Sequence, residues 1–594
     1  MRSTTPSRKE SGRPGRGACV PARTAPPFAA PAPALALGLA SGLSLGLSLG
    51  LALGAQAAPT GLAVLAGTQA LQAATAAPLP APAPAPVAAS TPGTLRFAIV
   101  RYALEGATLV EPGLLEAALE PHAGPGRSFD DVEAAVRAVR GLYERAGYSS
   151  VQVSVPEQAL VAGVVRLRVH EPKVGRVELL GAQHRSPGNV RRAVPALAEG
   201  RTPSDTVLSG ELRLANENPG RQMLLTMRAE PDEQLTAVLR VADQPAWLAR
   251  ASLDNGGPPG KGRVRVSLGA QHANLLERDI VGAVQLQGAP EAFEDVRIAS
   301  VSARVPLYGS GLMLDLSALY SSVDSGTVRT AAGDYLLASS GRNLALRLTR
   351  LLPRVGTVEP RAWVGWESRL VESRVTTTPG GASLVPDIEL RPLQAGLMGS
   401  WRTSDLSVSG QLSASLNVPG AGRSAAAAFA RPGLRAGADP RYTLARAGAS
   451  VSHFWAGGSV HANWSAQWSG DLLMAAEQFG IGGEGSVRGF ETRVASGDVG
   501  QRLSLEWMIP ARQLMLGTPL ELTWLAFLDL GQVRRLQPQP GENERATLVG
   551  GGLGLRLQQP RGLALRLDLG GALRAVGVAP ARGGFLHMGA EYTL

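Results

Sequence analysis

Cysteine is almost absent from this chain of 594 residues. The single one, Cys19, lies in the first 57 residues, a segment that we expect to be removed from the finished protein. The remaining chain then contains neither a thiol nor a disulfide, which excludes cysteine nucleophiles and cysteine-rich metal sites.

Lysine is also scarce, so arginine carries nearly all the positive charge. The formal net charge is +10, but the first 23 residues hold six basic side chains against one acidic side chain. The rest of the chain is therefore only weakly basic, and it has no zinc-finger or basic-helix motif. Nucleic acid is accordingly not among the partners that we expect.

Catalytic motifs are missing as well. The chain has no H-E-x-x-H zinc motif and no G-x-x-x-x-G-K-[ST] phosphate loop, and its seven histidines are scattered. We therefore predict that the protein is not an enzyme, that no residue is catalytic, and that it has neither a metal site nor a cofactor.

Long apolar runs are limited to one, Ala34 to Leu53, which follows a basic region and precedes Ala55-Gln56-Ala57. This order is typical of a secretory signal peptide, here residues 1–57, although the run is long enough for an uncleaved membrane anchor. No later run approaches about 18 apolar residues, so no further spanning helix is expected.

Alternating apolar and polar residues recur instead in region 245–594, in short runs separated by Gly, Pro, Asp and Asn. In one run, Leu503, Leu505, Trp507 and Ile509 oppose Arg502, Ser504, Glu506 and Met508; in another, Leu563, Leu565, Leu567 and Leu569 oppose Ala564, Arg566, Asp568 and Gly570. A membrane barrel places the apolar face outward and a soluble sandwich places it inward, so alternation alone leaves both folds open. At roughly 20 residues per strand and turn, a barrel would have about 16 strands.

Two α+β modules are predicted between residues 95 and 244. In the first, Ser128 caps a helix that ends at Arg145, and strands follow at 151–155 and 164–169. In the second, a strand at 174–180 precedes a helix at 188–197, a second helix with Thr202 as its cap and Pro203 at its first position, and two strands at 223–229 and 234–241.

One arginine-bearing glycine loop, Gly485-Ser-Val-Arg-Gly-Phe490, precedes an alternating strand at 520–530. On that strand the two faces are Leu520, Leu522, Trp524, Ala526, Leu528 and Leu530, and Glu521, Thr523, Leu525, Phe527 and Asp529. Side chains alternate across a strand, so the first face suits lipid and the second suits an interior. Arg488 can pair with Asp529 if the loop folds inward; alternatively, Arg488 is solvated and Asp529 pairs with Arg556 or Arg566.

These two segments resemble the VRGF/VRGY loop and the F-x-D-x-G strand of the outer-membrane assembly-factor superfamily, which includes the two-partner secretion transporters. The residues that carry this resemblance are Val487, Arg488, Gly489 and Phe490 in the loop, and Phe527, Asp529 and Gly531 in the strand. The resemblance implies that the loop of this chain is anchored in the barrel lumen through Arg488 and Asp529.

Further matches lie outside these two segments. Gly147-Tyr148, Pro156-Glu157-Gln158 and the run 163–169 are similar to the GY…P-x-Q…G-x-L-x-L-x-V pattern of the first POTRA domain, with Val165 in place of a leucine. The resemblance implies that Gly147, Tyr148, Pro156 and Gln158 belong to a client-binding motif. Asp254-Asn-Gly-Gly257 is similar to the D-N-x-G that opens such barrels, whereas the last residue, Leu594, stands where Phe or Trp is usual.

The implied fold is a transmembrane β-barrel of about 16 antiparallel strands, residues 245–594, preceded by two POTRA domains at 95–173 and 174–244. The VRGF loop would lie near 480–492. Residues 58–94 comprise a possible helix and an Ala/Pro-rich linker, which would form either the plug of such transporters or a plain spacer.

The implied function is the transport of an unfolded haemolysin- or adhesin-type exoprotein across the outer membrane of a Gram-negative bacterium. The POTRA domains would bind this client in the periplasm, where a sheet edge can accept an extended peptide. Outer-membrane lipids and the barrel-assembly machinery that inserts the barrel would be the other partners. An outer-membrane assembly or insertion factor and a passive porin-like channel are the alternative functions.

Overall fold

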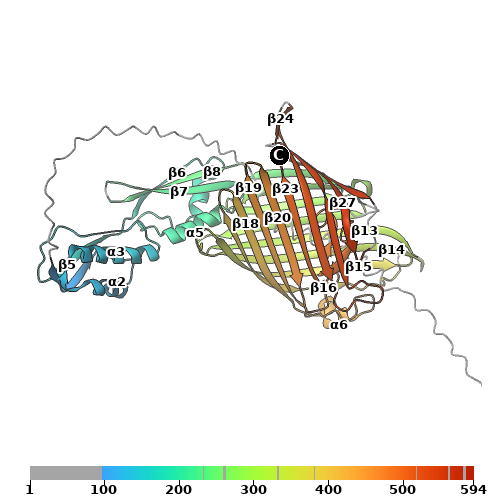
Figure 1. Ribbon diagram of the computed structural model, residues 1–594, viewed down its shortest axis with the longest axis horizontal. Coiled ribbons are helices and arrows are strands. Elements are labelled where there is room, and N and C mark those ends of the chain that lie inside the picture. Colours follow the sequence, from blue (N-terminus) through green and yellow to red (C-terminus); the bar gives the residue numbers. More distant parts are fainter. Residues whose placement is uncertain are drawn as a thin grey trace, which may run out of the picture.

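The protein is described by a computed structural model in which two small domains lead into a barrel (Figure 1). The described residues are 96–594 without 232, 258–261, 331–332, 380, 511, 517, 560–561 and 579–582. The predicted signal peptide, plug helix and linker fall outside them. No helix in the described ranges is both long and apolar enough to cross a bilayer.

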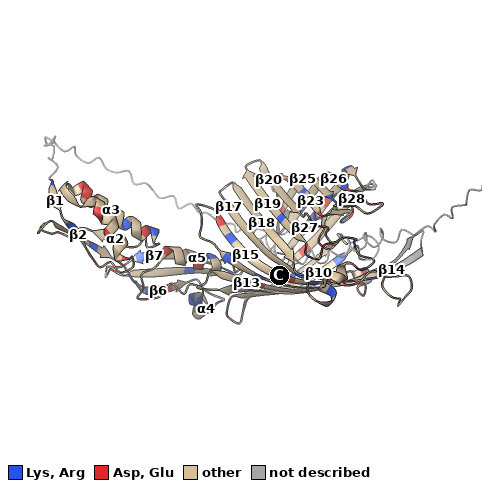
Figure 2. Cartoon of the chain, turned by 90° about the horizontal axis from the view of Figure 1, so that it is seen from below, with Lys and Arg blue, Asp and Glu red and all other residues tan. Residues whose placement is uncertain are grey.

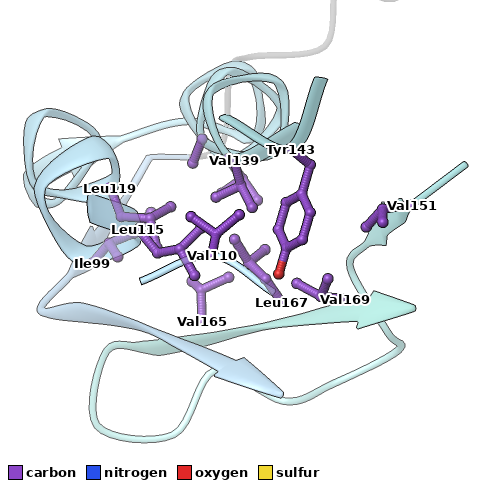
Figure 3. Close-up of a cluster of buried hydrophobic side chains, with 12 residues drawn as sticks. Ile99, Val110, Leu115, Leu119, Val139, Tyr143, Val151, Val165, Leu167 and Val169 are labelled. Carbon is purple, nitrogen blue, oxygen red and sulfur yellow. The ribbon is translucent and has the colours of Figure 1, made fainter. Parts of the chain in front are cut away.

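The first domain is built on a three-stranded sheet with the order β2-β5-β4, and a separate ribbon pairs β1 with β3. Its elements are β1 (Phe97–Ile99), β2 (Arg101–Glu105), α2 (Pro112–Leu119), η1 (Glu120–His122), β3 (Gly124–Arg127), α3 (Phe129–Arg145), β4 (Gln152–Ser154) and β5 (Val164–His170). Helix α3 begins as predicted, because Ser128 and Asp131 form a reciprocal capping box. Its apolar face packs on the sheet, where Tyr143 and Leu167 are fully buried (Figure 3).

The second domain repeats this plan with the sheet order β6-β8-β7. Its elements are β6 (Val174–Leu180), α4 (Pro187–Arg192), α5 (Asp205–Ala215), β7 (Arg221–Ala229) and β8 (Leu235–Asp243). Helix α4 is shorter than the predicted 188–197, since the residue before Pro195 is disfavoured in helical conformation.

The predicted start of α5 is wrong by two residues. Ser204, not Thr202, is the N-cap. Thr202 instead donates its hydroxyl to the Glu171 carbonyl at 3.4 Å, and Asp205 N–H donates to the Gly147 carbonyl at 2.8 Å. Both contacts join the two domains, so the interdomain link determines where the helix begins.

A buried polar cluster joins the second domain to the barrel. The Asp279 carboxylate, in the turn between the second and third barrel strands, forms an ion pair with Arg221 Nη2 at 2.8 Å and accepts a hydrogen bond from the Tyr308 hydroxyl at 3.0 Å. The Tyr308 hydroxyl in turn accepts from Arg221 Nη2 at 2.8 Å. The side chains of Arg221 and Asp279 are almost entirely shielded from solvent, so the second domain is fixed to the barrel end that it contacts.

The remaining strands form one closed antiparallel barrel. They are β9 (Trp247–Asp254), β10 (Arg265–Leu275), β11 (Ile280–Gly288), β12 (Val296–Leu307), β13 (Leu312–Thr330), β14 (Gly333–Leu351), β15 (Glu359–Thr376), β16 (Ile388–Leu390), β17 (Pro392–Arg402), β18 (Leu406–Asn417), β19 (Thr443–Trp455), β20 (Gly458–Trp468), β23 (Val499–Met508), β24 (Arg512–Leu516), β25 (Thr518–Arg534), β26 (Arg545–Gln558), β27 (Leu563–Val576) and β28 (Gly584–Thr593). Segments β16 and β17 pair with one strand, β15, and β23 and β24 pair with one strand, β25. Each pair is one interrupted strand, so the described part of the chain forms sixteen strands and the predicted fold class is confirmed.

The two faces of the barrel wall differ as predicted for a membrane barrel. On β25, the Trp524 side chain is exposed on the outside, whereas Leu525, Phe527 and Asp529 are buried on the inside. Figure 2 shows long stretches of barrel strand without charged residues, in contrast to α3. A soluble sandwich would bury the face that carries Trp524, so the structure excludes it.

The barrel closes where β28 pairs with β9, from Gly589–Asp254 to Thr593–Arg250. Asn255, in the D-N-x-G match, donates its side-chain amide to the Leu586 carbonyl at 2.7 Å and accepts from Met588 N–H at 2.8 Å. This asparagine extends the short pairing by side-chain hydrogen bonds beyond the end of β9.

Candidate functional site in the barrel lumen

The arginine loop, residues 469–498, joins β20 to β23 and folds back inside the barrel. Strand directions alternate from β9, which begins beside the second domain, so this loop leaves the barrel at the far end. Within it, β21 (Phe479–Ile481) and β22 (Ala495–Gly497) form a small hairpin. Val487 and Phe490 lie in the segment that connects the two strands of the hairpin, and both are fully buried in a cluster with Ile481, Val533, Ala546 and Leu548. Apolar packing on the inner wall thus holds both ends of the VRGF motif.

Arg488 pairs with Asp529 through both prongs of its guanidinium. Arg488 Nε donates to Asp529 Oδ2 at 2.7 Å and Nη2 donates to Oδ1 at 2.8 Å. The Arg488 backbone N–H also donates to Oδ2, at 3.1 Å. The two side chains are 5% and 1% exposed, so this is a charge-assisted, bidentate pair shielded from water.

The loop motif and the strand motif therefore meet, and each residue of the motifs has a distinct place. The guanidinium carbon of Arg488 lies 3.6 Å from the centre of the Phe527 ring, a cation–π arrangement. Gly531 lies beneath the loop, where an added Cβ would approach Val487 Cγ2 to 2.8 Å. On one face of β25, Phe527 thus supplies a ring, Asp529 supplies a carboxylate, and Gly531 leaves room for the loop.

The sequence did not identify three further polar residues that contact this pair. Arg488 Nη1 donates to Glu506 Oε1 at 2.6 Å, the Ser504 hydroxyl donates to Asp529 Oδ1 at 2.6 Å, and Asp568 Oδ2 lies 3.6 Å from Arg488 Nη1. All three lie on the polar faces of alternating runs, which marks them as inward-facing. Which inward residues meet the loop depends on strand register, and the runs themselves do not encode it.

The alternative pairing does not occur. Arg556 bonds instead to Asp568, at 2.6 Å and 3.0 Å, and Arg566 pairs with Glu484 of the loop. Asp529 consequently has Arg488 as its ionic partner, while Arg556 offsets part of the remaining negative charge.

Glycines make the contact between loop and wall possible. Gly489 has φ +90°, a left-handed conformation that other residues rarely adopt. On the wall opposite, an added Cβ at Gly550 would lie 1.9 Å from the Arg488 carbonyl oxygen, and one at Gly570 would lie 3.0 Å from the Gly489 nitrogen. The loop backbone lies directly on a wall surface without side chains.

The arrangement of these residues anchors the arginine loop to the barrel wall. An arginine, an aspartate and their partners fix a loop, and no nucleophile–base pair lies among them. Groups of three or more His, Cys, Asp or Glu suited to a metal ion do not occur in the described ranges.

The POTRA motif residues all contribute to the fold of the first domain. Gly147 ends α3 with φ +87° and accepts the hydrogen bond from Asp205, and Tyr148 packs against the domain core. Pro156 precedes Gln158, whose side-chain amide donates to the Arg166 carbonyl at 2.8 Å and accepts from Arg166 N–H at 2.7 Å. Gln158 therefore imitates a strand partner of β5 beyond the last residue of β4.

The family model described as haemolysin secretion/activation protein ShlB/FhaC/HecB matches residues 236–557, and that of the ShlB-type POTRA domain matches residues 97–172. The chain belongs to the haemolysin secretion/activation family. This family comprises two-partner secretion transporters, so the predicted function of outer-membrane protein translocator is confirmed at the level of the family.

Two solved structures share the fold of this chain. CdiB from Escherichia coli is 18% identical with a TM-score of 0.72, covering 94% of this chain and 99% of its own. CdiB from Acinetobacter baumannii is 16% identical with a TM-score of 0.66, covering 95% and 98%. These identities establish the shared fold alone. No curated protein matches the sequence.

Proposed function

We propose that this member of the family secretes one large exoprotein across the outer membrane of a Gram-negative bacterium, with both POTRA domains in the periplasm. The barrel would be inserted by the barrel-assembly machinery. The client would bind unfolded to the POTRA domains and leave through the lumen, without a catalytic step by this chain. The observation that supports this best is the Arg488–Asp529 pair, which anchors a loop inside a barrel fused to two POTRA domains.

The first POTRA domain offers a surface suited to an extended apolar peptide. Four large apolar side chains are exposed around the Gln158 segment: Val100, Val155, Leu160 and Val161. Gln158 alone covers the backbone groups of Arg166 there. A client strand that displaced Gln158 would take over its two hydrogen bonds to Arg166 and would add apolar contacts, so that backbone pairing sets the position of the client and the apolar contacts supply the affinity.

Secretion itself tests the proposal. When the chain is produced in a Gram-negative host together with a candidate client, a large secreted β-helical protein, that client should appear in the medium or on the cell surface. A chain lacking residues 95–244, with the barrel still in the outer membrane, is the control and should leave the exoprotein in the periplasm. Retention of the exoprotein by the intact chain would refute the proposal.

The apolar surface of the first POTRA domain makes a separate prediction. Leu160→Asp combined with Val161→Asp should weaken binding of the client's N-terminal region at least tenfold, because each buried apolar side chain contributes about 1.5–3 kcal/mol. Both side chains are exposed, so the fold should persist. Binding is measured by titrating that region onto the detergent-solubilised protein.

Leu114→Asp on α2 is the control, because Leu114 is also an exposed apolar side chain but lies on a helix and not in the Gln158 segment. Equal binding by the double variant and the control variant would show that the client uses a different surface of the POTRA domains.

A further inference from the structure

A second segment, residues 418–442 between β18 and β19, enters the far end of the barrel. It includes η3 (Gly422–Ser424) and α6 (Ala426–Phe429), which lies at the end away from the POTRA domains (Figure 1). Phe429 is almost fully buried in a cluster with Leu319 and Val371, which face inward on β13 and β15. We call residues 418–442 the lid, because apolar packing holds them against the inner wall.

The lid is tied to the arginine loop by a buried ion pair. Arg435 of the lid donates to both carboxylate oxygens of Asp498, the last residue of the loop, with Nη2 at 2.9 Å from Oδ2. The side chains are 1% and 0% exposed. Asp498 is ten residues beyond Arg488 and makes none of the contacts of the Arg488 site.

Asp498 also holds two other far-end segments. Its Oδ1 accepts from Leu473 N–H at 2.9 Å, at the start of the arginine loop, and its Oδ2 accepts from Leu536 N–H at 2.7 Å, in the loop after β25. Arg435 in turn donates to the carbonyls of Leu473 and Leu536. The Asp498 carboxylate thus accepts hydrogen bonds from Arg435 and from the backbone N–H groups of Leu473 and Leu536. It joins three loops: the lid, the arginine loop and the loop after β25.

We propose that Asp498 is a second positioning residue for transport, one that holds the lid closed across the far end of the barrel. The inference rests on the proposed function, because a client that passes through the lumen meets the lid only after it passes the Arg488 site. Release of the Arg435–Asp498 pair removes the buried ionic contact between the lid and the arginine loop and leaves the Asp439–Leu472 hydrogen bond and the apolar packing. The lid is then held more weakly, and the lumen opens more often at the far end. The Arg488 site holds the loop on the β25 wall and is not needed for this closure.

The test uses the whole protein in planar lipid bilayers, where channel openings are counted without any client. Asp498→Asn places an amide NH2 against groups that all donate, and it leaves Arg435 without a counter-charge. The frequency of openings should rise roughly a hundredfold, since losing one buried ionic partner costs about 3 kcal/mol and each 1.4 kcal/mol is tenfold.

Asp405→Asn is the matched control, because Asp405 accepts hydrogen bonds in the exposed turn between β17 and β18, at the opposite end. It should open as rarely as the unaltered protein. Heat-modifiable migration on gels shows which variants retain the folded barrel.

Opening by Asp498→Asn at the unaltered frequency, in a folded barrel, overturns the proposal. If that variant does not fold, Arg435→Lys decides by the same criterion, because lysine keeps the charge but lacks the planar fork and should open about tenfold more often. Loss of the fold in both variants would also overturn it, since Asp498 would then be required for folding. Because no client takes part, these outcomes are independent of whether the exoprotein is secreted.

Discussion

Arg488→Ala should abolish secretion while leaving the barrel in the outer membrane. The substitution removes the only positive charge that contacts Asp529 in the described structure, and it leaves Glu506, Asp529 and Asp568 facing one another around the empty space. Breaking one partner of a buried pair costs about 3–5 kcal/mol, which is enough to release the loop in most molecules. Secretion is measured by the amount of client in the medium and corrected for the amount of transporter in the outer membrane.

Arg545→Ala is the matched control, because Arg545 begins β26 and its side chain is 65% exposed. It should secrete normally. Normal secretion by Arg488→Ala as well would contradict the anchoring role, and so would its absence from the outer membrane, because the arginine would then be needed for assembly.

Asp529→Ala allows the pair to be tested as a unit. The single substitution should be less severe than Arg488→Ala, because Arg488 keeps Glu506 at 2.6 Å. The double substitution should be less than additive, since the interaction between the two side chains can be lost only once. Two defects that simply add would show that the residues act separately.

Gly550→Val should expel the same loop without changing any charge. Its Cβ would lie 1.9 Å from the Arg488 carbonyl oxygen, a backbone atom that cannot rotate away. Valine favours strands, so β26 itself should be at least as stable, and loss of secretion would arise from the loop alone. Whole cells treated with protease should show new cleavage within residues 469–498.

Gly571→Val provides the comparison on the neighbouring strand, because an added Cβ there meets nothing within 4 Å. It should secrete normally and resist the protease. Equal behaviour of the two valine variants would mean that the loop does not lie on the wall at Gly550.

Local sequence patterns predicted most of the fold because helix caps and strand faces are determined by residues close together in the sequence. The capping box placed α3 correctly, and alternation assigned Trp524 to the outside and Asp529 to the inside. The start of α5 was missed because Thr202 and Asp205 are engaged by the preceding domain. No pattern within the second domain encodes that contact.

In the candidate site, too, the contacts encoded by short motifs were predicted, and those that depend on distant parts of the chain were not. The Arg488–Asp529 contact was predicted from its two motifs, whereas Glu506, Ser504 and the Gly550 wall were not. Their place beside the loop depends on how β23, β25 and β26 are staggered. The Asp498 hub depends on three loops that meet only in the closed barrel, and a lone aspartate in a glycine-rich stretch carries no signal of it.

The Gln158 amide, which is hydrogen-bonded to β5, bears on how strongly a client would be held under the proposed function. A client backbone that takes its place exchanges one amide for another, so the number of hydrogen bonds on Arg166 does not change. The net gain from these bonds is close to zero, and the dwell time of the client then depends on a few apolar contacts. A grip of this kind dissociates quickly and can be renewed along successive stretches of a long polypeptide, so that no single stretch is held long enough to halt its passage.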